Sequence, residues 1–150
     1  MKKLLSVFLL MGLLLSLAAC KGESPKSELT LDDAQTLLDS GAFSEPLEEI
    51  DLEIACSLYA LDQSKITGAA VYGSTGATAE ELAVFIFSDA DAATAAKANF
   101  ETRIADRTGA MADYLPNEVP KLEKAVLEVR GATLLFVVAN DYGPVEELLK

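Results

Sequence analysis

Two runs of apolar residues constrain the fold of this 150-residue chain more than any other feature. Residues 82–87 (LAVFIF) and 133–139 (TLLFVVA) are apolar on both alternating faces. Successive side chains of a β-strand point to opposite faces of the sheet, so a strand with one wet face alternates between apolar and polar residues. Neither run alternates in this way. Each is therefore predicted to be a central strand of a sheet that is covered on both faces.

The neighbouring segments predict the partners of these strands. Residues 67–72 form a candidate strand of small residues before the first run, with a turn-rich loop at 73–79 between them. Residues 124–130 have one wet face, and Gly131 allows a tight turn into the second run. Each central strand is thus expected to belong to an antiparallel hairpin.

A long helix is predicted between the two hairpins. Asp89 and Asp91 supply capping oxygens and early acidic charge at its start, and Pro116 marks its end. Its buried face is expected to carry apolar residues at helical spacing, namely Ala93, Ala96, Phe100, Ile104, Met111 and Leu115.

Short helices are predicted after Thr30, from about Leu52 and from Pro144. The order of elements predicts an α+β fold: a mostly antiparallel four-stranded sheet of two hairpins, packed under the long helix, with short N- and C-terminal helices. The long helix covers only one face of the sheet. We expect the N-terminal helices to cover the other, with a partner subunit or a ligand as the alternatives. Residues 42–50 fit either an acidic surface or an edge strand.

The N-terminus has the features of an export signal. Lys2 and Lys3 precede a largely apolar run at 4–17, which as a helix would extend about 21 Å and fall short of a bilayer core of about 30 Å. The run ends in LAAC at 17–20, which resembles the lipobox of bacterial lipoproteins in all four positions. This resemblance implies cleavage before Cys20 and a diacylglycerol group on the Cys20 sulfur.

The chain is accordingly divided into a signal peptide (1–19), a lipidated Cys20 with a polar tether (20–30) and a single α+β domain (31–150). The tether is rich in polar residues and has almost no apolar side chains to bury. We expect a protein on the extracytoplasmic face of the cell membrane, held there through the lipid on Cys20 and not by a spanning helix.

The charge balance excludes one class of partner. Without residues 1–19 the chain carries 10 Lys and Arg against 24 Asp and Glu, a net charge of −14. Proteins that bind DNA or RNA need clustered cations to displace the counterions of the phosphates. Nucleic acid is therefore not expected as a partner, and adhesion to anionic lipid headgroups is disfavoured.

Most familiar catalytic arrangements are also absent from the sequence. It contains no histidine, so Ser-His-Asp and Cys-His sites are impossible and zinc lacks its usual nitrogen ligand. Cys56 lies on the apolar stripe of the second predicted helix, where a buried, unreactive side chain is expected. We predict no catalytic residue, no metal ligand and no cofactor.

One polar cluster stands out in the long helix. Arg103 and Arg107 are spaced i, i+4, where like charges repel, and Tyr114 follows further along. An opposite charge should compensate. An internal salt bridge to acidic residues of the N-terminal segments is favoured, and an anionic ligand held by the two guanidinium groups is the alternative.

Several segments together resemble a known family. They are the lipobox, residues 58–62 (LYALD), residues 76–85 (GATAEELAVF), Arg103, residues 114–116 (YLP) and the closing hairpin. They resemble a family of small bacterial lipoproteins described as domain of unknown function 4358, over about residues 44–149. The resemblance implies a cell-surface lipoprotein with a compact α+β domain, and it implies no activity, cofactor or site.

These observations predict a membrane-anchored extracytoplasmic lipoprotein. Its domain is expected to be a non-enzymatic module that binds an envelope protein or a small ligand. Two alternatives are an envelope hydrolase that uses carboxylates only, and an inhibitor or accessory subunit of another envelope protein. The sequence leaves the oligomeric state open.

Overall fold

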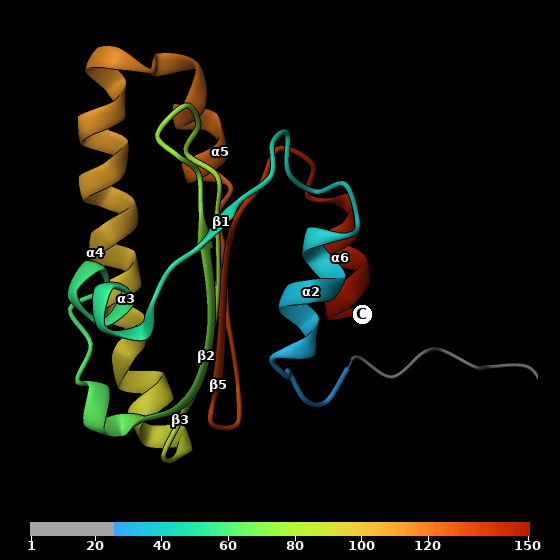
Figure 1. Ribbon diagram of the computed structural model, residues 1–150, viewed down its shortest axis with the longest axis vertical. Coiled ribbons are helices and arrows are strands. Elements are labelled where there is room, and N and C mark those ends of the chain that lie inside the picture. The colour runs from blue at the N-terminus through green and yellow to red at the C-terminus, as the bar shows by residue number, and fades with distance from the viewer. Residues whose placement is uncertain (1–25) are drawn as a thin grey trace, which may run out of the picture.

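The computed structural model describes residues 26–150. The predicted signal peptide, Cys20 and the first part of the tether lie outside the described residues. The described part forms an antiparallel sheet in the order β1-β2-β3-β5-β4, with helices on both faces (Figure 1). The strands are β1 (Glu48–Glu49), β2 (Ile66–Gly73), β3 (Glu81–Phe87), β4 (Val126–Arg130) and β5 (Thr133–Val138).

The two central strands are confirmed. Strand β3 pairs with β5, with Glu81 opposite Val138 and Phe85 opposite Leu134. All six residues of β5 are buried. The two hairpins, β2–β3 and β4–β5, are also confirmed, and Gly131 turns the second one at a φ of 58°.

The prediction of four strands is wrong, because the described residues form five. The additional strand is β1, in which Glu48 pairs with Gly73 and Glu49 with Tyr72. Both glutamates are exposed, so β1 joins the sheet through its backbone alone. A two-residue strand of this kind has no apolar alternation from which to predict it. Of the two alternatives left open for residues 42–50, the edge strand is found at 48–49, and these same two glutamates also form an exposed acidic surface.

The long helix covers one face of the sheet, together with two shorter helices (Figure 1). Its core is aromatic: the ring of Phe100 stacks on that of Tyr59 at 4.6 Å between centroids and contacts Phe136 at 5.4 Å. Asp89 caps the long helix by accepting a hydrogen bond from the Ala92 amide at 2.8 Å. The helices of this layer are α3 (Leu52–Leu58), α4 (Ala90–Tyr114) and α5 (Val119–Glu123).

The opposite face is covered by α2 (Asp32–Leu38) and α6 (Gly143–Leu149) (Figure 1). Leu37 and Val145 from these helices pack with Leu82 and Leu135 of the sheet in a second core. The expectation that N-terminal helices cover this face therefore holds for α2 and is wrong for α3. The chain passes along the sheet edge as β1 between these two helices, which brings α3 to the same face as α4.

Helix α5 and the 3-10 turns η1 (Gln63–Lys65) and η2 (Pro116–Glu118) were not among the predicted elements. Pro120 lies in the first turn of α5, where a missing N–H costs no helical hydrogen bond. Leu122 of α5 is buried in the core beneath α4. Among the residues described, no helix is both long enough and apolar enough to cross a membrane.

Candidate functional site

The centre of the candidate site is Glu81, the first residue of β3. Side chains alternate along β3, so Glu81 faces α4 together with Ala83 and Phe85. The Glu81 side chain is only 3% exposed. A charged group this deeply buried requires compensating partners.

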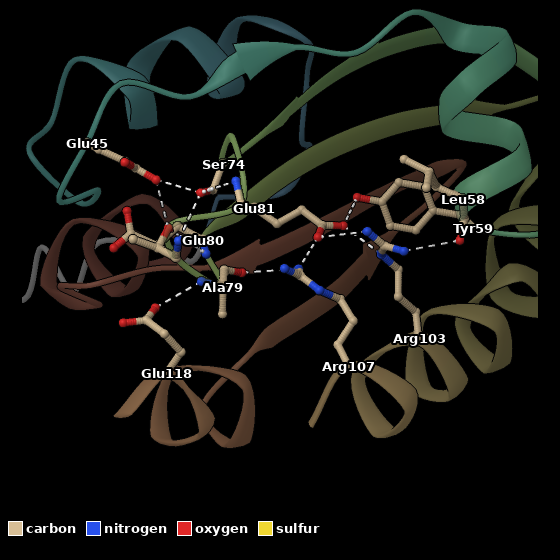
Figure 2. A network of polar contacts seen from close by, with 12 residues as sticks. Glu45, Leu58, Tyr59, Ser74, Ala79, Glu80, Glu81, Arg103, Arg107 and Glu118 are labelled. Carbon is tan, nitrogen blue, oxygen red and sulfur yellow. Dashed lines mark hydrogen bonds and ion pairs between the residues drawn. The ribbon is translucent and has the colours of Figure 1, made fainter. Parts of the chain in front are cut away.

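Two arginines of α4 supply that compensation (Figure 2). Arg103 binds Glu81 with two hydrogen bonds, from Nε to Oε1 at 2.7 Å and from Nη2 to Oε2 at 3.0 Å. Arg107 Nη1 donates to Glu81 Oε2 and also to the carbonyl oxygen of Ala79, the latter at 3.1 Å. The i, i+4 spacing that makes the arginines repel each other on an isolated helix thus places both on one carboxylate.

Tyr59, which directly follows α3, completes the cluster. Its hydroxyl donates to Glu81 Oε1, and the Arg103 guanidinium lies 4.8 Å from the centre of its ring (Figure 2). Burial and then the charge of Glu81 raise the pKa of Tyr59 well above its ordinary value. Burial acts to lower the pKa of Arg103, but the ion pair with Glu81 outweighs it and the pKa is raised. Both groups therefore stay protonated and continue to donate to Glu81.

The structure brings together two of the three residues singled out from the sequence. Arg103 and Arg107 share Glu81, whereas Tyr114 is 63% exposed at the end of α4. Tyr114 has no hydrogen bond to either arginine within residues 26–150. The acidic partner comes from β3 and not from the N-terminal segments. Sequence reasoning missed Glu81 and Tyr59, and the only signal was a glutamate pair at the edge of a run predicted to be buried.

A second buried carboxylate lies beside the first. Glu80 is fully buried and accepts hydrogen bonds from Lys121 Nζ of α5 at 2.7 Å and from the amide of Ser44 at 2.8 Å. Burial acts to raise the pKa of Glu80, but the bonds from Lys121 and Ser44 outweigh it and the pKa is lowered. A general acid needs the opposite shift. The Glu80 side chain is arranged as an ionised structural link.

The backbone of Ala79, directly before the two glutamates, is hydrogen-bonded through both its amide and its carbonyl group. The amide of Ala79 donates to Glu118 Oε2 at 2.9 Å, while its carbonyl accepts from Arg107. Glu118 also pairs with Lys121 at 3.0 Å. The start of β3 is thereby connected to α4, η2 and α5. Because the backbone at Ala79 is held in place, the direction of the Glu81 side chain is set as well. The two arginines that bind Glu81 are positioned by it in turn.

The arginines also line a surface hollow of about 240 Å³ between α4 and the end of α3. Its wall includes Leu58, Tyr59, Asn99, Arg103, Asp106 and Arg107. The Arg103 and Arg107 side chains are 18% and 20% exposed, so both reach solvent here. This combination of half-buried cations and a concavity fits a small anionic ligand.

The described residues form no site suited to metal binding or to thiol chemistry. Within residues 26–150, no group of three or more acidic or cysteine side chains could hold a metal ion. Cys56 is buried, as predicted. Burial and then the charge of Asp62 raise the pKa of its thiol, which disfavours the reactive thiolate.

The fold and the site define a small α+β domain in which a sheet lies between two helical layers and one layer carries a paired-arginine hollow. The chain belongs to the family described as Domain of unknown function (DUF4358), which matches residues 39–139. The match covers β1 to β5 and includes Glu80, Glu81, both arginines and Lys121. No curated protein and no solved structure matches the chain significantly.

Proposed function

We propose that this protein is a membrane-anchored extracytoplasmic lipoprotein whose domain is a non-enzymatic binding module of the cell envelope. The LAAC sequence at 17–20, with its resemblance to a lipobox, supports the anchor on Cys20. The hollow lined by Arg103 and Arg107 supports the binding role.

The main support for the proposal is the position of the N-terminal end of the described chain relative to the arginine hollow. The described chain enters the domain on the α2–α6 side: the Lys26 carbonyl accepts a hydrogen bond from Arg130, and Leu29 is buried in the core under α2 and α6. The arginine hollow lies on the opposite side of the sheet. The six residue-to-residue steps from Cys20 to Lys26 span at most about 20–22 Å. A lipid on Cys20 would therefore keep the α2–α6 side near the membrane and present the hollow away from it.

Metabolic labelling with palmitate tests the anchor. The wild-type chain is expected to incorporate label and to remain with membranes, whereas the Cys20→Ala variant is expected to lose both properties. The matched control is Cys56→Ala, which removes the other cysteine and should label like the wild type, because Cys56 lies in the folded core. Equal labelling of the wild type and Cys20→Ala would overturn the proposed anchor.

Energy transfer to the membrane tests the orientation. In a Cys56→Ala background, a donor dye is attached at Thr36→Cys on α2 or at Ala98→Cys on α4, both of which are exposed positions. The lipoprotein is then reconstituted into vesicles that contain acceptor-labelled lipid. Transfer from position 36 is expected to exceed transfer from position 98, because the two helices lie on opposite sides of the sheet. Equal or reversed transfer would contradict the proposed orientation.

A further inference from the structure

We propose that the hollow beside Arg107 binds the carboxylate group of a small ligand with a single negative charge and an apolar body. This inference deepens the proposed binding function and rests on it. It names the chemistry of the ligand and the residues that recognise it. Arg107 would bind the carboxylate, and Leu58 at the rim would contact the apolar body.

The charge of the site supports an anion. Two guanidinium groups, from Arg103 and Arg107, face a single buried carboxylate, that of Glu81. Tyr59 adds no charge, because its raised pKa keeps the hydroxyl protonated. Both guanidinium groups therefore share one carboxylate, and Asp106 on the wall of the hollow forms an ion pair with neither of them within residues 26–150.

The hydrogen bonds of the two arginines show which of them has N–H donors left for a ligand. Arg103 uses Nε and Nη2 for Glu81 and Nη1 for the Leu58 carbonyl. Arg107 uses only Nη1, for Glu81 and the Ala79 carbonyl. Its Nε and Nη2 donate to no group within residues 26–150. These two atoms form the edge of a guanidinium that binds a carboxylate with two parallel hydrogen bonds.

The walls of the hollow restrict the ligand further. The volume of about 240 Å³ lies below the roughly 300–1,000 Å³ of pockets that enclose drug-sized molecules, so the site suits a small group. Asp106 lines the same hollow and has no ion pair in the described chain, so its charge opposes a ligand with more than one negative charge. Leu58 is 41% exposed, and Ile54, one turn earlier on α3, is 54% exposed. Of these two residues, Leu58 lines the hollow and offers an apolar surface to the ligand.

Calorimetric titration of the full-length lipoprotein in non-ionic detergent tests the inference. The probe is N-acetyl-L-leucine, and the matched control is N-acetyl-L-leucinamide, which has the same body without the carboxylate. We expect binding of the acid at concentrations up to about 10 mM and binding of the amide that is weaker by about tenfold or more, because a hydrogen bond to a charged group is lost. No binding of the acid in this range, or equal binding of both compounds, would overturn the proposal.

Three variants separate recognition from folding. Arg107→Lys keeps a positive charge near Glu81 but lacks the two unused guanidinium nitrogens, so affinity is expected to fall about tenfold or more while the far-ultraviolet circular dichroism is unchanged. Asp106→Asn removes a like charge from the wall and is expected to tighten binding about two- to fivefold. Lys97→Gln removes a positive charge elsewhere on α4 and should leave affinity unchanged. Unchanged affinity in Arg107→Lys, or weaker binding in Asp106→Asn, would refute the assignment.

A carboxylate of this kind has two sources, a free small acid and the C-terminus of a peptide chain, and a further titration distinguishes them. A tetrapeptide that ends in leucine with a free carboxylate presents the same terminal group as the probe. Tighter binding of the peptide than of N-acetyl-L-leucine would identify a chain terminus as the ligand, and weaker binding would identify a free small acid. Failure of these titrations leaves the anchor intact, because palmitate labelling of Cys20 is measured separately.

Discussion

Replacing Glu81 with Gln is expected to lower the free energy of unfolding by about 3–5 kcal/mol, the cost typical of breaking a buried ion pair. The Glu81 side chain is 3% exposed and accepts hydrogen bonds from Arg103, Arg107 and Tyr59. Gln has nearly the same size but no charge. Two guanidinium groups would then face each other across a neutral amide, which itself presents N–H donors to them.

Urea unfolding at pH 7 measures this effect. The matched control is Glu101→Gln, which makes the same chemical change at an exposed position of α4 and should alter stability by no more than about 0.5 kcal/mol. The double variant Glu81→Gln/Arg107→Gln removes one of the stranded cations as well. It should be less destabilised than the sum of its single variants, because the two groups are in contact. A loss below about 1 kcal/mol for Glu81→Gln would show that this cluster is not a stabilising one.

The Glu80→Gln variant is expected to lose about 1.5–3 kcal/mol at neutral pH, with a loss that disappears in acid. Glu80 is fully buried and is bound by Lys121 and Ser44. These partners hold its pKa below the ordinary value of 4.5 despite burial, which acts in the opposite direction. The ionised form is therefore stabilised by folding, and Gln cannot provide it.

The sign of the pH dependence follows from this lowered pKa. A carboxyl whose pKa is lower in the folded state than in the unfolded state contributes its full stability above the unfolded value of 4.5. That contribution is lost as the pH falls from 4.5 through the folded value. Once the Glu80 carboxyl is protonated, it is as neutral as the amide of Gln. The difference between the wild type and Glu80→Gln should thus be largest near pH 7 and smallest near pH 3.

Unfolding curves in urea at several pH values between 7 and 3 test this prediction. The Glu101→Gln variant again serves as the control, because it makes the same chemical change at an exposed position where the carboxylate has no ion pair within residues 26–150. A Glu80→Gln difference that stays constant from pH 7 to pH 3 would contradict an ionised Glu80. A difference that grows in acid would indicate a raised pKa, the property that a carboxylate-only hydrolase would need.

The two adjacent glutamates have a common structural consequence. Glu81 connects the start of β3 to α4, and Glu80 connects it to α5 and to the loop that carries Ser44. The arginine hollow is therefore built on backbone that is held from several elements. A site held in this way loses little side-chain freedom when a ligand binds, which favours affinity for a small group.

Much of the fold could be predicted because the relevant signals are local. The runs at 82–87 and 133–139 became the central strands, and the helix predicted to end at Pro116 became α4, which ends at Tyr114. Cys56 and the stripe residue Phe100 are buried as expected. Hydrophobic periodicity reports burial directly, since each side chain either packs in the core or does not.

The missed elements gave no such signal. Strand β1 consists of two exposed glutamates that pair only through the backbone. Helix α5 has only five residues, including Pro120 in its first turn, and is too short to show a helical spacing of apolar residues. The side of the sheet on which α3 packs depends on how the chain crosses the edge at β1.

The sequence by itself determined the class of fold, the two buried strands, the long helix and the pairing of Arg103 with Arg107 on one helical face. Only the tertiary structure decided that Glu81 is their partner, that Tyr59 and not Tyr114 completes the cluster, and that a hollow opens beside Arg107. The physical reason is distance along the chain. Glu81 lies 22 residues from both Tyr59 and Arg103, and contacts of that separation exist only once the sheet and α4 have packed together.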